Sequence, residues 1–186
     1  MAAALILGGV VLSGWLVVTK AIASQIPPPA YQLATQGTGV PAEVLYAIAL
    51  QESGALLHGV LTPWPWTLNI AGKPYRFNRR DAACNALLQG VFEVGAKAVD
   101  AGLGQINMGW NGEHFAHPCE ALDPYRNLAV VTALLQQHKT TDNTWITVAG
   151  RYHRPAGGYQ ADRYRKSFAK HLNRITQSSL QGTKAP

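Results

Sequence analysis

Charged side chains are scarce in this sequence: they make up 14% of its 186 residues, whereas hydrophobic side chains make up 47%. The high apolar content excludes intrinsic disorder for most of the chain. No short period recurs, and no repeat of roughly 20–50 residues is present, which excludes collagen-like chains, coiled coils and repeat proteins. The length predicts one domain, large enough to fold without a metal or a cysteine scaffold.

Cysteine is scarce as well, since the sequence contains only Cys84 and Cys119. In an exported protein this pair predicts one disulfide bond, and two independent buried thiols are the alternative. His114, His117 and Cys119 bring metal-ligand types close together, but zinc needs a defined set of ligands and Cys119 is expected to pair with Cys84. The sequence also lacks a glycine-rich phosphate loop and a nucleophile elbow. We therefore expect neither a metal nor a cofactor.

Charge is absent from the whole segment 2–18. This apolar run is slightly long for the core of a signal peptide and slightly short for a membrane span. Small residues at Ala21 and Ala23 suit a signal peptidase, so residues 1–23 are expected to be a cleaved signal peptide or else a membrane anchor. Both alternatives predict an exported, periplasmic protein that meets the membrane only through this segment. Residues 24–30 would then form a stiff, proline-rich linker.

Positive charge is concentrated near the C-terminus. Residues 151–186 contain eight Lys or Arg and one Asp, whereas the preceding chain contains eight basic and nine acidic residues. A solvated basic helix is one interpretation; attraction to a polyanion, such as an acidic wall polymer, an anionic lipid or a nucleic acid, is the other. No zinc finger, RNA-binding aromatic signature or DNA-binding motif is present, so nucleic acid is not an expected partner.

The pattern of apolar residues predicts a mainly α fold. A helix that starts at Pro41 would end at Gly54, because proline suits the first helical position and glycine suits a helix end. Residues 58–78 break the helical pattern, and short apolar runs flank residues 71–74 there, which predicts one small inserted β-hairpin. A polar tail that begins at Gln177 is expected to be loose. Further helices are expected at 81–94, 124–138, 145–152 and 161–175.

Glu52 continues the apolar stripe of the first predicted helix, four residues after Ile48 and eight after Val44. A glutamate on an apolar face is desolvated, and desolvation favours its neutral form. A carboxyl group that stays protonated near neutral pH is what general-acid cleavage of a glycosidic bond requires. The alternative is a glutamate at a fraying helix end that turns to solvent.

Two other blocks place polar side chains where a ligand could bind. Gly102–Asn107 (GLGQIN) would form a tight turn that presents amide groups, and amides suit sugar hydroxyls and N-acetyl groups because each offers a donor and an acceptor. Ala149–His153 (AGRYH) places Tyr152 at a helix end, where its hydroxyl can point into a cleft. Taken singly, the first block is also compatible with an ordinary turn and the second with a core tyrosine.

Together with Gln51–Gly54 (QESG), these blocks occur in a definite order along the chain. They resemble the SLT-type lytic transglycosylase domain, which typically shows a Glu-Ser pair, a Gly-Leu-x-Gln block and a late Ala-x-x-Tyr-Asn block. Asp123-Pro124 with Asn127 also resembles the Asp-Pro-x-x-Asn helix of that family. The resemblance implies a lysozyme-like domain over residues 31–176 that cleaves peptidoglycan, and the polar residues 177–186 that follow are expected to be a flexible tail.

The resemblance also implies a mechanism. Glu52 would protonate the oxygen of the bond between MurNAc and GlcNAc with assistance from the substrate's own acetamide. Glu52 would then take the proton of the MurNAc 6-hydroxyl as a 1,6-anhydro ring closes. No second carboxylate is needed, in contrast to two-carboxylate hydrolysis, and Asp100 would instead orient the glycine loop. The residues expected to position the sugar or the glutamate are Ser53, Leu103, Gln105, Ile106, Asn107, Tyr152 and Trp66.

Two positions depart from the family pattern: Gly104 stands where the family has Met, and His153 where it has Asn. The relatives that this chain resembles are small enzymes of conjugation, type IV secretion or pilus systems. The expected partners are therefore peptidoglycan glycan strands and components of such a machine. The alternatives are a muramidase or endolysin-type hydrolase of the same fold and a wall-binding assembly protein without catalytic activity.

Overall fold

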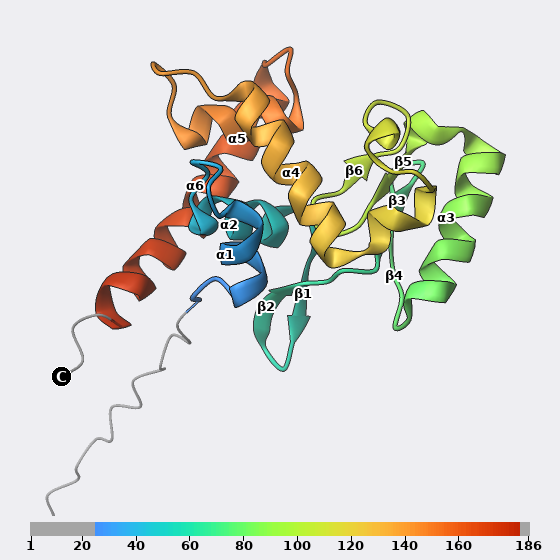
Figure 1. Cartoon of the computed structure of the whole chain (residues 1–186), viewed down its shortest axis with the longest axis horizontal. Helices are drawn as coiled ribbons and strands as arrows, with labels where there is room; N and C mark the ends of the chain where they lie inside the picture. Colours follow the sequence, from blue (N-terminus) through green and yellow to red (C-terminus); the bar gives the residue numbers. More distant parts are fainter. Residues whose placement is uncertain (1–24, 183–186) are drawn as a thin grey trace, which may run out of the picture.

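The structure, a computed structural model, describes residues 25–182 of the chain (Figure 1). The predicted signal peptide or anchor at residues 1–23 lies outside the described residues, as do residues 183–186. Within the described range, no helix has both the length and the apolar character needed to cross a membrane.

Helices dominate the described chain, which confirms a mainly α fold. Two boundaries differ from the prediction: Pro29 starts a helix inside the predicted linker, and the last helix continues through the start of the predicted tail to Gly182. The α-helices are α1 (Pro29–Thr35), α2 (Ala42–Ser53), α3 (Arg80–Val94), α4 (Pro124–His138), α5 (Trp145–His153) and α6 (Tyr159–Gly182).

The β structure of the described chain is larger than the single predicted hairpin. A two-stranded antiparallel sheet pairs β1 (Gly54–Leu57) with β2 (Val60–Pro63). A four-stranded sheet has the order β4-β3-β5-β6. The strands of this second sheet are β3 (Thr67–Ile70), β4 (Lys73–Arg76), β5 (Val99–Ala101) and β6 (Ile106–Asn107).

The predicted hairpin is the pair β3–β4, in which Ile70 lies opposite Lys73. Ala71 and Gly72 form its turn with positive φ angles of 51° and 80°, the backbone that two-residue hairpin turns favour. The prediction of only one hairpin was wrong because β5 and β6 have three and two residues, too few to show a period of two. The β1–β2 hairpin was missed because its apolar residues are largely exposed, so no buried face marks it.

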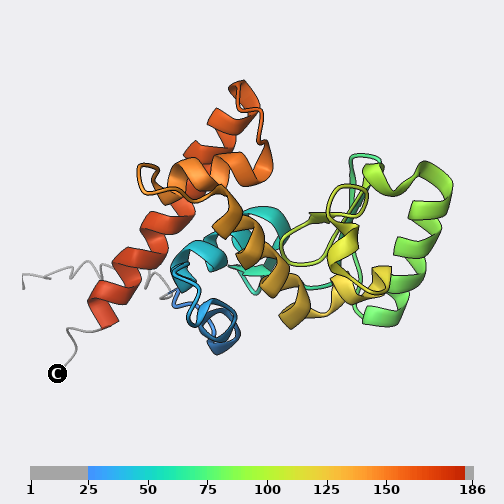
Figure 2. The same cartoon turned by 45° about the horizontal axis from the view of Figure 1, so that its top comes forward.

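The helices and the four-stranded sheet lie in different parts of the molecule. In Figures 1 and 2, α1, α2, α5 and α6 gather on one side, the sheet lies on the other, and α4 extends between them. α3 packs against β3 and β5. This arrangement leaves the C-terminal end of α2 facing the sheet, and a cleft can form between them.

Helix α2 is the centre of the helical part, where it packs against α1, α4 and α6. Every side chain from Val44 to Leu50 is buried. The predicted apolar stripe is therefore correct but too narrow, because this helix is enclosed on all sides. At Gly54, where α2 passes into β1, a Cβ atom would lie only 2.3 Å from the Leu50 carbonyl oxygen, so glycine is required at this turn.

The predicted disulfide between Cys84 and Cys119 is present, with the two Cα atoms 5.2 Å apart. It joins α3 to the 3₁₀ helix Pro118–Leu122, which directly precedes α4. Arg80 reinforces the same junction, since its Nη2 donates a hydrogen bond of 3.0 Å to the Cys119 carbonyl oxygen. The sheet side of the molecule is thereby fixed to the start of α4.

Candidate active site

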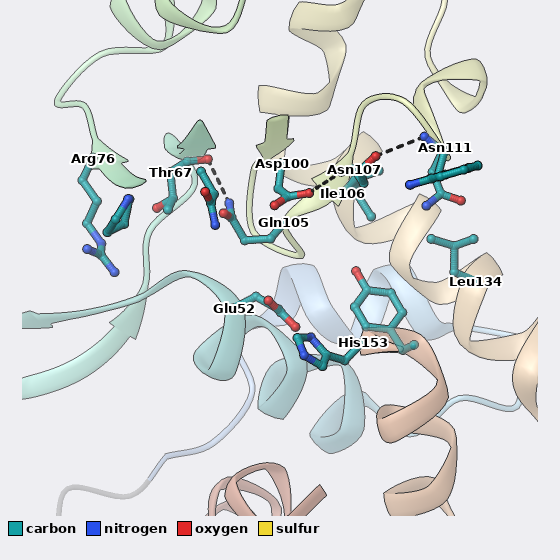
Figure 3. A pocket seen from close by; sticks show the side chains of 14 residues that line it. Glu52, Thr67, Arg76, Asp100, Gln105, Ile106, Asn107, Asn111, Leu134 and His153 are labelled. Carbon is teal, nitrogen blue, oxygen red and sulfur yellow. Dashed lines mark hydrogen bonds between the residues drawn. The ribbon is translucent and has the colours of Figure 1, made fainter. Parts of the chain in front are cut away.

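A cleft of about 410 Å³ lies between the helical part and the four-stranded sheet (Figure 3). Glu52 at the end of α2 and His153 at the end of α5 lie on one wall, and residues of the four strands lie on the other. Of the residues predicted for a site, the structure brings five to this cleft: Glu52, Gln105, Ile106, Asn107 and Tyr152.

Glu52 is half-buried, and Figure 3 shows its carboxyl group in the space between Gln105 and His153. Its Oε1 accepts a hydrogen bond of 2.6 Å from the hydroxyl of Tyr164 on α6. Burial raises the pKa of Glu52 from 4.5 to about 7, the Tyr164 hydrogen bond lowers this pKa, and the negative charge of Asp100 raises it. Glu52 is therefore substantially protonated near neutral pH. The hydrogen bond from Tyr164 holds the carboxyl group in place through Oε1 and leaves Oε2 for a ligand.

Tyr164 is itself fixed by the ring of His153, which stacks on it at 4.4 Å between ring centroids and an interplanar angle of 8°. Burial raises the pKa of Tyr164 well above its ordinary value, so its hydroxyl stays a donor. His153, the residue that departs from the family pattern, thus supports the partner of Glu52 and also lines the cleft. Burial lowers the pKa of His153, which favours the neutral imidazole at pH 7.

The glycine loop 102–105 is tied to the rest of the molecule by Asn127 of α4. Asn127 is fully buried; its Oδ1 accepts from the Gly104 backbone N–H at 2.8 Å, and its Nδ2 donates to the Ala101 and Ala121 carbonyl oxygens. Helix α4 places this side chain because Asp123 caps the helix, accepting from the N–H groups of the next turn. The predicted Asp-Pro start and Asn127 therefore serve to position the loop.

Ser53 and Tyr152 hold the same loop from the helical side. Ser53 is fully buried, and its Oγ lies 2.9 Å from the Leu103 carbonyl oxygen. Tyr152 donates from its hydroxyl to the Gly104 carbonyl oxygen at 2.6 Å. Ser53 does not reach the cleft, so its place in the structure is that of a support next to Glu52, whereas Tyr152 both supports the loop and lines the cleft.

Gly104 is the second departure from the family pattern, and the packing explains it. A Cβ atom there would lie 2.1 Å from Val131 Cγ2 and 2.9 Å from the Tyr152 hydroxyl. No side chain fits at this position without displacing a helix residue. The hydroxyl of Tyr152 and the methyl group of Val131 therefore occupy the space that a larger residue would need.

Gln105 has a positive φ of 48°, which is uncommon for a residue with a side chain. Its Nε2 donates to the carbonyl oxygens of Thr67 and Gly102 at 3.0 and 2.9 Å. These bonds use both amide hydrogens and hold the strained backbone in place, leaving Oε1 as an acceptor at the cleft.

Asn107 contributes differently. Its Nδ2 donates to Asp100 Oδ1 at 2.8 Å, and its Oδ1 accepts from the backbone N–H groups of Gly109 and Trp110 at 3.1 Å. Burial raises the pKa of Asp100, although this hydrogen bond opposes the rise. Asn107 is therefore engaged within the protein, and it orients a second carboxyl group that also lines the cleft.

Leu103 and Trp66 do not line the cleft, although both were predicted to contact the sugar. Leu103 faces a separate apolar cavity of about 210 Å³ shared with Tyr31 and Tyr46. Trp66 packs against the core and meets Trp64 edge to face at 6.1 Å. Ile106 lines the cleft but is almost fully buried.

Three cleft or support residues were not predicted for their chemistry. Tyr164 lies in the helix expected at 161–175, where nothing in the sequence set its hydroxyl apart. Trp110 lines the cleft with 64% of its surface exposed, and Lys97 Nζ lies 4.1 Å above its ring. Arg76 of β4 also lines the cleft and donates from Nη2 to the Gly54 carbonyl oxygen at 2.8 Å, which connects the sheet to the end of α2. Trp110 follows several glycines in the sequence and gives no periodic signal.

No His, Cys, Asp or Glu cluster able to hold a metal ion is present within residues 25–182. The metal-ligand types noted in the sequence are used otherwise: His117 Nδ1 accepts from the Cys119 backbone N–H, and Cys119 is in the disulfide.

No protein-family model, no curated protein and no solved structure matches this chain. The SLT-type family and the lysozyme-like fold therefore stay predictions. What the geometry does provide is one carboxylic acid with a pKa near 7, set in a cleft whose other wall carries amides, a second carboxyl group and an exposed tryptophan.

Proposed function

We propose that this protein is a peptidoglycan lytic transglycosylase that acts outside the cytoplasm. The observation that supports this most is Glu52: it lines the cleft, its Oε1 accepts from Tyr164, and its pKa is raised to about 7. A general acid works best when its pKa lies near the working pH, because it is then both present in the acid form and ready to give its proton. The choice of peptidoglycan as the substrate rests on the resemblance of the three sequence blocks to the SLT-type lytic transglycosylase domain.

In the proposed reaction, Glu52 gives its proton to the O4 atom of GlcNAc as the bond from MurNAc C1 to that oxygen breaks. The acetamide of MurNAc stabilises C1 from the opposite face. The ionised Glu52 then takes the proton of the MurNAc 6-hydroxyl as O6 bonds to C1. The products are a free GlcNAc 4-hydroxyl and a 1,6-anhydro-MurNAc end, no water is consumed, and Glu52 regains its proton.

The surrounding residues suit this sequence of steps. Tyr164 donates to the carboxylate form of Glu52, which stabilises the ionised intermediate and keeps Oε2 toward the sugar. Trp110 offers an exposed ring face to a sugar, and Gln105 Oε1 offers an acceptor to a sugar hydroxyl or acetamide N–H. Asp100 is held by Asn107 and acts on Glu52 through its charge.

A hydrolase is the second candidate, and the presence of Asp100 in the same cleft favours it. In that mechanism a second carboxylate activates water or attacks the sugar. Asp100→Asn distinguishes the two reactions. If the protein is a lytic transglycosylase, Asp100→Asn still cleaves glycan strands and still forms the 1,6-anhydro product. If it is a hydrolase that uses Asp100, the variant loses roughly a thousandfold or more in rate, the scale of a missing nucleophile or base.

The decisive experiment is digestion of purified sacculi, followed by mass spectrometry of the released fragments. The proposal expects 1,6-anhydro-MurNAc ends from the parent protein and none above background from Glu52→Gln, in which the side-chain shape is kept and the proton is lost. Reducing MurNAc ends would establish a hydrolase. Equal lysis by parent and Glu52→Gln would remove Glu52 from the reaction, and binding of sacculi by the parent without release of any fragment would establish a wall-binding protein without catalysis.

Location and partners belong to the same proposal. The disulfide favours an oxidising compartment such as the periplasm. The proposed partners are glycan strands and a conjugation, secretion or pilus machine that needs a local gap in the wall.

A further inference from the structure

A second pocket of about 320 Å³ lies beside the cleft and is not used by the proposed reaction. It is formed where the end of α2, the end of α5 and the start of α6 meet, and α5 and α6 pack against each other (Figures 1 and 2). His153 lines both the cleft and this side pocket. The residues that line the side pocket are Gln51, His153, Gln160, Arg163, Tyr164 and Ser167.

The side pocket is next to the proposed acid. Tyr164, which lines it, donates to Glu52 Oε1, and Gln51 directly precedes Glu52 in α2. A sugar seated at Glu52 can therefore extend a substituent past His153 into this pocket without leaving the protein surface.

The charge of the side pocket is positive. Arg163 contributes a guanidinium, and no Asp or Glu of the part of the chain that the structure describes lines the pocket. Within residues 25–182, Arg163 takes part in none of the ion pairs; its guanidinium carbon instead lies 5.9 Å above the ring of Tyr159. A guanidinium that is exposed and free of a carboxylate partner can bind an incoming carboxylate with two parallel hydrogen bonds.

The remaining polar groups suit a peptide backbone. The Gln51 Oε1 atom is buried and receives no hydrogen bond from any residue of the described range. A buried acceptor without a donor is unfavourable, so a turn of the Gln51 side chain toward the pocket that it lines, where a peptide N–H can reach Oε1, would relieve this cost. Ser167 adds a hydroxyl, and the amide of Gln160 adds a further donor.

We infer that this side pocket binds the acidic peptide carried by the sugar unit at the cleaved bond, with Arg163 holding a carboxylate of that peptide. The inference rests on the proposed function, because it names which form of the polymer the cleft receives. It means that the protein prefers glycan strands that still carry their peptides over strands from which the peptides have been removed.

The test compares two substrates of equal glycan length: strands with their peptides and strands stripped of them by an amidase. We expect kcat/KM to be higher for the peptide-bearing strands. Arg163→Ala should lower the ratio of the two kcat/KM values by about tenfold, the effect of a lost charge-assisted hydrogen bond. Lys166→Ala is the matched control, since Lys166 is an exposed basic residue of α6 that does not line the side pocket; it should leave the ratio unchanged.

Cleavage of both strands with equal kcat/KM, or an equal effect of the Arg163 and Lys166 variants, would overturn the inference while leaving the proposed function intact. Cleavage of neither strand would instead contradict the proposed function. A binding measurement then decides the side pocket alone: NMR titration with MurNAc carrying L-Ala-D-Glu, and with MurNAc. Tighter binding of the peptide compound that Arg163→Ala abolishes supports the pocket, and equal binding of both compounds overturns it.

Discussion

The hydroxyl of Tyr164 donates a hydrogen bond of 2.6 Å to Oε1 of Glu52, although the two residues are 112 positions apart in the sequence. This contact joins α6 to the end of α2 and is the one direct hydrogen bond to the carboxyl group of Glu52 within the described residues. It acts against burial: burial favours the neutral acid, whereas the hydrogen bond favours the carboxylate. The balance places the pKa of Glu52 where one group can serve first as an acid and then as a base.

Replacement of Tyr164 by phenylalanine tests this balance. Loss of the donor removes a contribution that lowers the pKa of Glu52, so the pKa rises and the acid form persists to higher pH. We expect the alkaline limb of the kcat/KM profile to move up by about one pH unit, the size of one net hydrogen bond. Tyr125→Phe is the control, because Tyr125 is exposed and lies outside the cleft. An alkaline limb that stays in place or moves to lower pH would show that Tyr164 does not tune Glu52.

Replacement of Glu52 by glutamine should stabilise the fold at high pH. The pKa of Glu52 is about 7 in the folded protein and 4.5 as the ordinary value, so the folded state binds more protons than the unfolded state between these values. The free energy of unfolding of the parent therefore falls as pH rises from about 4.5 to 7, and glutamine does not share this loss. We expect Glu52→Gln to be more stable by about 3 kcal/mol above pH 7 and by little below pH 4.5.

Chemical denaturation of both proteins across this pH range measures that difference. A stability gain that is the same at every pH would point to packing. If Glu52→Gln is less stable than the parent above pH 7, the raised pKa of Glu52 is contradicted.

Gly104 should not tolerate even a methyl group. A Cβ atom there would overlap Val131 Cγ2 and crowd the Tyr152 hydroxyl, and overpacking of this kind costs about 1–3 kcal/mol. Gly104→Ala should lower the unfolding free energy by that amount, and Val131→Ala in the same chain should recover part of it. Gly112→Ala is the control, since its Cβ would meet only Met108 Cε at 3.8 Å. If the Gly104 and Gly112 variants unfold at the same denaturant concentration, the packing around Gly104 has room for a methyl group, which contradicts the prediction.

The disulfide should contribute strongly to stability. Cys84 and Cys119 are 35 positions apart, and closing a loop of this length stabilises the fold by about 3–4 kcal/mol when it constrains the unfolded chain. We expect the double replacement Cys84→Ala and Cys119→Ala to lower the unfolding free energy by that amount, and reducing agent to have no effect on the double variant. A loss below about 1 kcal/mol would indicate that the Arg80 hydrogen bond and the packing of α3 hold this junction without the covalent bond.

Local patterns in the sequence were enough to predict much of this site. Glu52 follows Val44 and Ile48 at helical spacing, so its desolvation could be inferred from one helix, and burial does raise its pKa. The β3–β4 hairpin was marked by Ala71-Gly72 between apolar runs, and Asp123 before proline marked the start of α4. In each case the signal and the structure lie within a few residues of each other.

The sequence could not predict contacts between distant segments. Tyr164 sits on an apolar face of α6 and gives the same signal as a core residue; only the fold shows that its hydroxyl meets Glu52. The separation of Leu103 and Trp66 from the cleft has a different, local origin: neighbouring residues of a tight loop or turn point in different directions, and the sequence does not say which of them faces the cleft. The one available hint was that Tyr164 carries a hydroxyl on an otherwise apolar face, and a buried tyrosine hydroxyl usually finds a hydrogen-bond partner.

The central claim is that Glu52 keeps its proton near neutral pH until a sugar chain arrives. The most direct test is an NMR titration of the glutamate side-chain carboxyl carbons, with the Glu52 signal assigned by its absence from Glu52→Gln. The structure predicts a midpoint near pH 7. A midpoint near the ordinary value of 4.5 would mean that the group is ionised before substrate binds, and it would contradict the role of Glu52 as the acid.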